Sequence, residues 1–445
     1  MEIPETPKRP SRKRWKILIG VLLAFLLLLP LLLLVSVSEN KSNVSTSSAA
    51  SPQDAQRVKH VLGQLKYASY YNRPINILIS EQDMNSFFRL AERGISRLKG
   101  EARVSVESGT TINVSLSTPE NPFGNHVNLT VAMPAFSSGV EFKYLKIGQI
   151  TLTGETALRQ IKLFMKKLLG QEQTDTLFHS IKRIRTVDKK LIVTYQPIQN
   201  LGEQLANIAN LRKLINDNAN AAFTNEKIHY YYSQLCQHLT TTEETSLGGL
   251  LQQAMSLAAQ ESESTNHAGM ENRAALIASA ILFGSYRFNS IVQAVPKQEL
   301  KTCQAKAPDT TLAKRHDLSL HFIFAAAIKI LSDSHISFAV SEFKELSDSL
   351  RGGSGFSFTD LAADQTGIRF AELASSDHSD LYLQQQADKL NSEPFFFPKI
   401  RDLPEGIPQR QFEQEYGNVE GDRYQQMLDQ INQRINALPL YENAP

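Results

Sequence analysis

Three pairs of polar residues within residues 315–367 have the types and spacing of a metal or acid–base site. The pairs are Asp317 with His321, Glu345 with Asp348, and Asp360 with Asp364. Side chains three or four positions apart on a helix share one face, so each pair needs only a helix to bring its two groups together. Each pair also lies among small or apolar residues, which favours convergence inside a helical bundle.

Carboxylates that converge inside a protein need a neutralising charge or must share protons. That charge is either a bound cation or one of the basic residues of the same segment, which are Arg315, Lys344 and Arg351. Carboxylate ligands favour Mg, Ca or Mn, and an imidazole admits Zn and Fe. The cofactor expected at such a site is a divalent metal. The candidate metal ligands are Asp317, His321, Glu345, Asp348, Asp360 and Asp364, and all but Asp317 are also the candidate catalytic groups.

Two other interpretations fit the same residues. The pairs also suit a buried structural polar network, in which His321 is a core histidine with satisfied hydrogen bonds. They suit solvated helix faces as well, because Lys344 and Asp348 have the spacing of an ordinary exposed ion pair. Glu271 either adds to the cluster or only stabilises the start of its own helix. The spacing alone does not choose among these interpretations.

The elements that must position these groups are helices expected over residues 311–332, 334–350 and 357–371. Ser357 or Thr359 is expected to cap the third helix, after the glycine-rich loop of residues 351–355. Apolar periodicity predicts further helices over residues 201–217, 220–239, 247–260, 270–290 and 421–437. Residues 260–269 are expected to form a loop, and residues from Pro394 onward an extended, turn-rich segment.

Residues 101–153 change to a period of two and predict an antiparallel meander of four or more strands. A helix from about Gln53 to Tyr70 and an extended segment over residues 76–80 precede it. Ser80 then has the position of an N-cap for a helix that ends near Gly94. Helices over residues 155–170 and 173–183 and a strand over residues 189–197 complete this part of the chain.

The N-terminus carries a membrane signal. Residues 17–37 contain no charge over 21 positions, about the length that spans a bilayer. Lys and Arg residues precede the run and Trp15 flanks it, so the expected topology is N-terminus in the cytoplasm and bulk outside. A cleaved signal peptide is the competing interpretation, although its apolar core would be shorter. The expected location is the bacterial inner membrane, single-pass, with the bulk in the periplasm.

These observations together predict an α+β chain with one N-terminal transmembrane helix. A membrane-proximal antiparallel-sheet domain with flanking helices and a distal all-α helical domain follow. The expected boundaries are a basic tail at 1–16, the transmembrane helix at 17–37, a tether at 38–53, the α+β domain at 54–199, the helical domain at 200–380, and an extended segment with a last helix at 381–445.

Composition excludes several protein classes. Lys and Arg number 47 against 45 Asp and Glu, a net charge of +2, so no nucleic-acid partner is expected. Two cysteines cannot form a disulfide scaffold or a cysteine-rich zinc module. Cys236 and Cys303 form either one disulfide, in an oxidising compartment, or two buried thiols. Sequence motifs for nucleotide binding, zinc proteases and serine hydrolases are missing.

Two stretches resemble known families. Residues 75–197 resemble YpmS-like and LmeA-like membrane-anchored exported domains through Ile79, Ser80, Glu81, Met84, Asn85, Leu145, Lys146, Ile147, Gly148, Ile150 and Leu152. That resemblance implies a curved sheet near a helix, with affinity for lipid. Residues 315–367 resemble the uncharacterised YfiM-like envelope lipoproteins through His316, Asp317, His321, Phe322, Lys344, Glu345, Asp348, Ser349, Asp360, Leu361, Ala363 and Gly367. It implies an envelope location and a helical unit, although this chain has no lipobox.

Two functions follow from the sequence. The first is a non-enzymatic factor of the bacterial envelope that binds lipid or an envelope protein. The alternative is a metal-assisted hydrolase acting on an envelope polymer or lipid through the His, Asp and Glu cluster. Metal analysis separates the two functions best.

Overall fold

The structure is a computed structural model of the 445-residue chain. It describes residues 35–44, 49–95, 97–119, 121–198, 224–239, 245–284, 287–292, 294–304, 309–332, 334–349 and 352–445. The expected helix over residues 201–217 and the basic tail over residues 1–16 lie outside the described residues.

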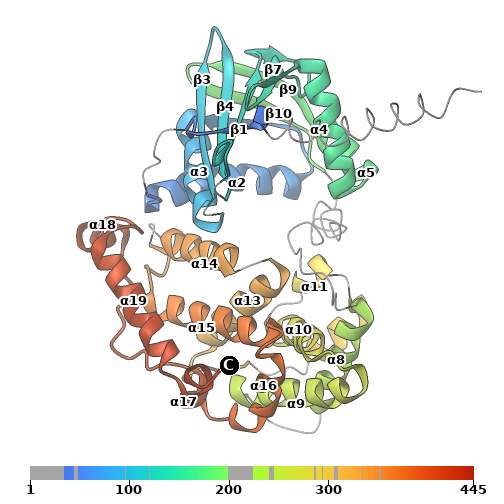
Figure 1. Ribbon diagram of the computed structural model, residues 1–445, viewed down its shortest axis with the longest axis vertical. Coiled ribbons are helices and arrows are strands. Elements are labelled where there is room, and N and C mark those ends of the chain that lie inside the picture. Colours follow the sequence, from blue (N-terminus) through green and yellow to red (C-terminus); the bar gives the residue numbers. More distant parts are fainter. Residues whose placement is uncertain are drawn as a thin grey trace, which may run out of the picture.

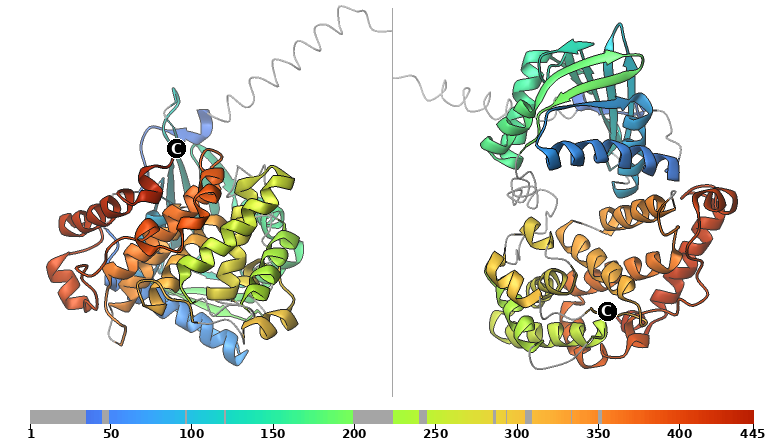
Figure 2. Two further views of the ribbon diagram at one scale, coloured as in Figure 1. Left: turned by 90° about the horizontal axis from the view of Figure 1, so that it is seen from below. Right: turned by 180° about the vertical axis from the view of Figure 1, so that it is seen from behind.

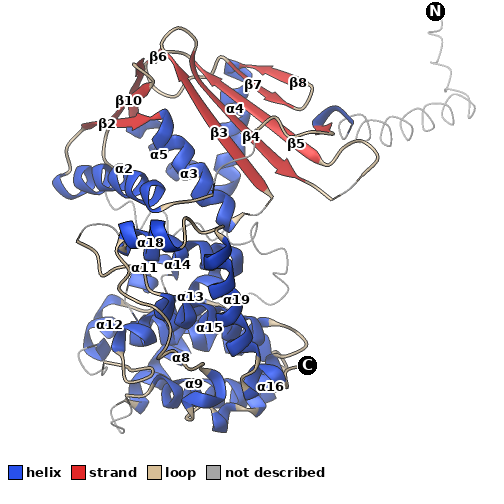
Figure 3. Ribbon diagram, turned by 90° about the vertical axis from the view of Figure 1, so that its left-hand side faces the viewer, coloured by secondary structure: helices blue, strands red, loops and turns tan. Residues whose placement is uncertain are grey.

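The described residues form two units that lie one above the other (Figure 1). The sheet unit contains ten strands between Ser38 and Tyr195, and the helical unit follows from Asn225. The fold is therefore mixed α and β, with the strands confined to one end of the molecule (Figure 3). The alternation of period two before residue 200 and the helical period after it account for this separation.

The first sheet has the order β3-β4-β5-β7-β8, and β1 pairs with β5. The second sheet has the order β2-β10-β9-β6. All of these pairings are antiparallel, which confirms the predicted meander. The strands are β1 (Ser38–Glu39), β2 (Ile75–Ser80), β3 (Leu98–Ser105), β4 (Gly109–Ser117), β5 (His126–Met133), β6 (Phe136–Ser137), β7 (Tyr144–Ile147), β8 (Ile150–Thr153), β9 (Ile181–Val187) and β10 (Lys190–Tyr195).

Two helices of the sheet unit begin with a capping box. Ser80 accepts a hydrogen bond from the Asp83 backbone in a capping box at the start of α3 (Glu81–Gly94), as its N-cap position predicts. Ser51 caps α2 (Pro52–Tyr71) in the same way. Helix α4 (Gly154–Leu169) packs on β7 and β8, and α5 (Gln171–Ser180) packs on α4 and β9.

The helical unit buries one large apolar core between its helices, and Ala50 and Ala55 of the sheet unit also belong to this core. Its helices are α8 (Asn225–His238), α9 (Leu247–Thr265), α10 (Ala268–Ser279), η2 (Ala280–Gly284), α11 (Arg287–Val292), α12 (Lys297–Gln304), α13 (His316–Leu331), α14 (Ser334–Asp348), α15 (Phe358–Ser375), α16 (Asp380–Gln385), η3 (Ala387–Lys389), α17 (Glu393–Phe396), α18 (Gln409–Glu415), α19 (Asp422–Asn436) and α20 (Pro439–Glu442). The loop expected over residues 260–269 is mostly wrong, because α9 continues to Thr265 and α10 begins at Ala268, which leaves only Asn266 and His267 between them.

The helix expected over residues 270–290 is also wrong as one continuous helix. Helix α10 ends at Ser279, a π-helix runs to Gly284, and α11 begins at Arg287. The apolar period predicts that the segment is buried but does not distinguish α from π winding. The short helices α12, α16 and α18 were not expected, because so short a helix depends on tertiary packing more than on its own sequence.

The membrane-spanning part of the predicted fold class is corrected. Among the residues that the structure describes, no helix combines the length and the apolar composition needed to cross a bilayer. The transmembrane helix predicted over residues 17–37, and the single-pass membrane topology inferred from it, are therefore not supported by the described part of the chain. Residues 17–34 lie outside the described residues, and residues 35–37 form a short helical turn before β1.

The two units meet at helix α14. Helices α2 and α3 of the sheet unit contact α14, and the view from behind shows α2 lying along the boundary (Figure 2). Arg93 of α3 donates two hydrogen bonds, of 2.7 and 2.9 Å, to the Glu342 carboxylate of α14. Tyr424 of α19 donates a third, of 2.6 Å, to the same buried carboxylate. One charged pair thus links elements 249 positions apart in the chain.

Candidate metal centre in the helical unit

Helices α13, α14 and α15 pack against one another and bring the predicted polar residues together. His321 lies in the second turn of α13, Glu345 in α14, and Asp360 and Asp364 in the first two turns of α15. Ser357 fixes the start of α15 by accepting a hydrogen bond from the Asp360 backbone, as expected of its cap. All four side chains are buried or nearly so.

His321 lies between the two carboxylates of α15. Its Nε2 atom is 3.2 Å from Asp360 Oδ2, and its Nδ1 atom is 3.0 Å from Asp364 Oδ1. The imidazole is 8% exposed. The spacing of Asp360 and Asp364 explains this arrangement. Residues four apart on a helix lie on the same face one turn apart, so their carboxylates contact the two nitrogens of the ring.

Glu345 and Lys344 complete the cluster from α14. Lys344 Nζ lies 2.8 Å from Glu345 Oε1, 2.9 Å from Asp348 Oδ2 and 3.7 Å from Asp360 Oδ2. The second Glu345 oxygen accepts a hydrogen bond of 3.0 Å from the Ser357 backbone. Lys344 is thus the ammonium that faces three carboxylates, and its side chain is 46% exposed.

Two predicted residues lie at the margin of the cluster. Asp317 is 52% exposed and pairs with Arg315, so its expected pairing with His321 is wrong. Arg315 also pairs with Glu405 and reaches within 3.6 Å of Asp360 Oδ1. Asp348 contacts Lys344 and is 26% exposed. The third expected cation, Arg351, lies outside the described residues.

Burial and charge act against each other on the pKa values in the cluster. Burial lowers the pKa of His321, but the two carboxylates beside it outweigh burial and raise that pKa to about 10. Burial raises the pKa of Glu345 to about 7, despite the opposing charge of Lys344. Burial also raises the pKa of Asp364. For Asp360, burial is outweighed by the hydrogen bond and charge of His321 and by Lys344, so its pKa is lowered.

Two buried carboxylate oxygens of the cluster have no hydrogen-bond partner within the described structure. They are Asp364 Oδ2 and Asp360 Oδ1, and Asp364 is only 3% exposed. One ligand atom each from His321, Glu345 and Asp364 lies within 4.8 Å of the others. In the described part of the chain, this is the group of His, Cys, Asp and Glu residues whose spacing suits a metal ion.

Glu271 does not add to the cluster. It is fully buried in α10, where it accepts a hydrogen bond of 2.6 Å from Tyr231 and pairs with Lys227 at 2.9 Å. Burial and the Glu271 carboxylate raise the pKa of Tyr231 far above its usual range. This separate polar contact joins α8 to α10. Nothing in the sequence predicted that Tyr231 would be the partner of Glu271.

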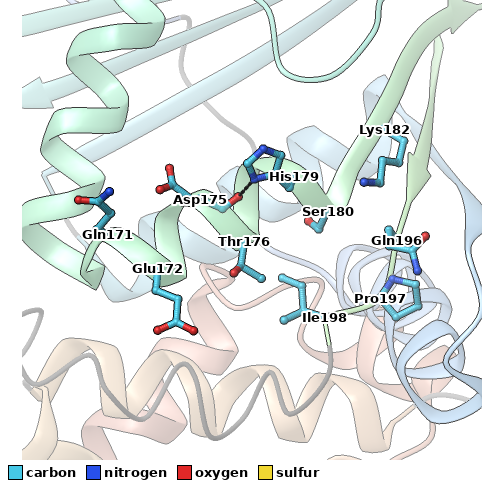
Figure 4. Close-up of a pocket in the computed structure, with 10 residues that line it drawn as sticks. All are labelled: Gln171, Glu172, Asp175, Thr176, His179, Ser180, Lys182, Gln196, Pro197 and Ile198. Carbon is cyan, nitrogen blue, oxygen red and sulfur yellow. Dashed lines mark hydrogen bonds between the residues drawn. The ribbon is translucent and has the colours of Figure 1, made fainter.

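Two cavities lie in the sheet unit, beside α5 and on α4. The larger, about 660 Å³, is lined by Gln171, Glu172, Asp175, Thr176, His179, Ser180, Lys182, Gln196, Pro197 and Ile198 (Figure 4). The Nδ1 atom of His179 lies 2.6 Å from the backbone carbonyl oxygen of Asp175, one turn earlier in α5. Neither this cavity nor a second one on α4 is lined by residues of the cluster.

Comparison with protein-family models, curated proteins and solved structures found no match. The resemblances to YfiM-like, YpmS-like and LmeA-like proteins therefore stay predictions. What the cluster does chemically follows from its own donors, distances and charges.

Proposed function

We propose that the helical unit binds one divalent cation through His321, Glu345 and Asp364, and that the chain is a non-enzymatic, cation-binding factor. The observation that carries the proposal is the Asp364 carboxylate, which has a buried oxygen, Oδ2, without a hydrogen-bond partner and forms a group of metal-ligand spacing with His321 and Glu345. A buried polar atom left unsatisfied costs stability, and a cation would satisfy it.

The donor set favours zinc or manganese. One imidazole and two carboxylates suit these metals better than calcium, which takes oxygen ligands only. Whichever ring nitrogen of His321 binds the metal, the other keeps a carboxylate neighbour, Asp360 or Asp364. Such a neighbour orients the ring of a metal-binding histidine.

Lys344 is the internal competitor of a bound cation. Its ammonium already faces Glu345, Asp348 and Asp360. Because the side chain is nearly half exposed and flexible, it can turn toward solvent when a cation enters. Without a cation, Lys344 and the imidazolium of His321 neutralise the carboxylates as a buried ionic network.

The disulfide supports an exported location. Cys236 and Cys303, 67 positions apart, form a disulfide between α8 and α12. Disulfides persist in oxidising compartments such as the bacterial periplasm. The metal-assisted hydrolase is the second candidate, and the cavities beside α5 and on α4 lie away from the cluster.

The test uses the purified full-length chain, stripped with chelator and titrated calorimetrically with Zn²⁺ and Mn²⁺. We expect one bound metal per chain and a rise in melting temperature, because a ligand that binds only the folded state stabilises it. Asp364→Asn should abolish binding. Lys344→Met, which removes the competing ammonium, should bind the metal more tightly than the unaltered chain.

Matched controls are Asp402→Asn and Lys399→Met, which change the same residue types at exposed positions and should leave metal binding unaltered. If both the unaltered chain and Lys344→Met bind no metal, the proposal fails and the buried ionic network stands. Because Lys344→Met keeps all three ligands, this outcome holds even where Asp364→Asn does not fold.

A further inference from the structure

The second sheet, of strands β2, β10, β9 and β6, has one buried face and one exposed face. Alternate residues of a strand point to opposite faces of its sheet, and the buried Ile77, Ile184 and Leu191 define the inner face. The outer positions are therefore the even-numbered residues of β2 and β10 and the odd-numbered residues of β9. In the view from behind, β9 and β10, in green, lie at the front of the sheet unit (Figure 2).

One row of outer residues crosses all four strands. Phe136 of β6 lies opposite Arg185 of β9. Ile192 of β10 lies opposite Arg185 on the other side and is itself opposite Leu78 of β2. Phe136 is 61% exposed and Leu78 is 45% exposed, and Val187 in the next row is 40% exposed. Because the solvated face of an antiparallel sheet normally carries polar residues, these adjacent apolar side chains mark an interaction surface.

The same face is basic. Arg185 lies within the row that crosses the sheet, and Arg183 and Lys190 lie in the rows on either side of it. All three cationic side chains are exposed, and no outer position of the four strands holds an acid. The one carboxylate between residues 181 and 195 is Asp188, in the turn between β9 and β10. Such a face attracts carboxylates, and the arginine guanidinium matches their planar geometry.

The edge of this sheet at β2 is closed to an added strand. The Leu78 N–H donates to Gln64 Oε1 of α2 at 3.2 Å, and Gln64 Nε2 donates to the Leu78 carbonyl oxygen at 3.4 Å. The Ser80 N–H donates to the Asp83 carboxylate at 2.8 Å. Strand addition needs free backbone groups at a sheet edge, so a partner docks on the outer face instead of extending the sheet at β2.

We propose that this outer face binds an acidic segment of a partner protein that also presents apolar side chains. Carboxylates of the segment pair with Arg183, Arg185 and Lys190, and its apolar side chains pack on Phe136 and Leu78. A second copy of the chain does not fit, because a face-to-face dimer would set the same three cations against one another. A polyanionic polysaccharide would leave the apolar side chains without apolar partners. The proposal is independent of the cation site in the helical unit.

The test is a selection from a phage-displayed library of random peptides on the purified full-length chain. We expect the enriched peptides to combine Asp and Glu with Leu, Ile or Phe. Fluorescence anisotropy then measures the affinity of an enriched peptide for variants of the chain. Arg185→Glu should weaken binding by about 25-fold or more, the loss typical of an interface hot spot. Phe136→Ala should weaken it by about fivefold or more.

Matched controls are Arg410→Glu, at an exposed position of α18, and Phe164→Ala on α4, where the ring is 58% exposed. Both should leave binding unaltered. No enriched peptide, enriched peptides without acids, or binding that Arg185→Glu leaves unaltered would overturn the proposal. Binding of polygalacturonate or of phosphatidylglycerol vesicles that is tighter than that of any enriched peptide, and is lost in Arg185→Glu, would also overturn it, in favour of a polysaccharide or a lipid surface.

Discussion

Gly367 of α15 lies so close to Phe322 of α13 that a Cβ atom at position 367 would be 2.1 Å from the Phe322 carbonyl oxygen. This contact marks a close approach of the two helices. His321 is the residue before Phe322, and Asp364 lies one turn before Gly367, so the same approach brings the imidazole to 3.0 Å from the carboxylate. The glycine is thus a condition for the cluster as well as for the packing.

Gly367→Ala should destabilise the chain by about 1–3 kcal/mol, because the added methyl group forces the two helices apart. Urea unfolding followed by circular dichroism measures the change. Gly63→Ala is the matched control, because a Cβ at position 63 of α2 meets nothing within 4 Å. It should stabilise the chain by about 0.5–1 kcal/mol, as alanine does in an exposed helix. Equal effects at both positions would contradict the close-approach argument.

Helical spacing predicted part of the cluster and failed where neighbours compete. Asp360 and Asp364 share a face because they lie four apart on one helix, and the structure has them on both sides of His321. Asp317 has the same spacing to His321, yet it pairs with Arg315 at the exposed start of α13. Spacing fixes the face of a helix, but not which charged neighbour a flexible side chain contacts.

Contacts between helices could not be predicted from helical spacing. No sequence pattern distinguishes Glu342 from Glu345 three positions later, yet Glu342 binds Arg93 across the boundary between the two units. The same limit applies to Ser357, whose backbone N–H bonds Glu345. The period-two meander and the Ser80 cap were predictable because they depend on local alternation and on one capping side chain.

Arg93→Ala should destabilise the chain by about 3 kcal/mol, at the lower end of the range for breaking a buried ion pair. Glu342 would keep only the hydrogen bond from Tyr424 while staying 2% exposed. Arg434→Ala is the matched control, because its partner Asp402 is 64% exposed, and it should cost no more than about 1 kcal/mol. Urea unfolding compares the two variants, and similar losses would show that the interface pair behaves as a surface ion pair.

Asp54 should make stability dependent on pH in the acid range. Burial raises its pKa, but hydrogen bonds from Arg89, Ser86 and Ser51 outweigh burial and lower it from the ordinary 3.8. A carboxyl with a lowered pKa stabilises the fold above 3.8 and loses that contribution as the pH falls further. Asp54→Asn should therefore unfold more easily than the unaltered chain at pH 7, with the difference shrinking below pH 3.8. A difference that stays constant with pH, or that also appears for the exposed Asp388→Asn, would refute this.

Replacing both His321 and Asp364 should change the free energy of unfolding by an amount that differs from the sum of the two single changes. In metal-free protein, each single variant leaves a buried partner without its opposite charge, whereas the double variant removes both charges of the 3.0 Å contact at once. His321→Ala and Asp364→Asn should therefore couple by about 0.5–3 kcal/mol in a double-mutant cycle measured by urea unfolding. The control cycle pairs His321→Ala with Asp429→Asn on the exposed side of α19, where the losses should add within about 0.5 kcal/mol. Additive losses in the first cycle would show that the contact contributes nothing specific, whether or not the protein binds a metal.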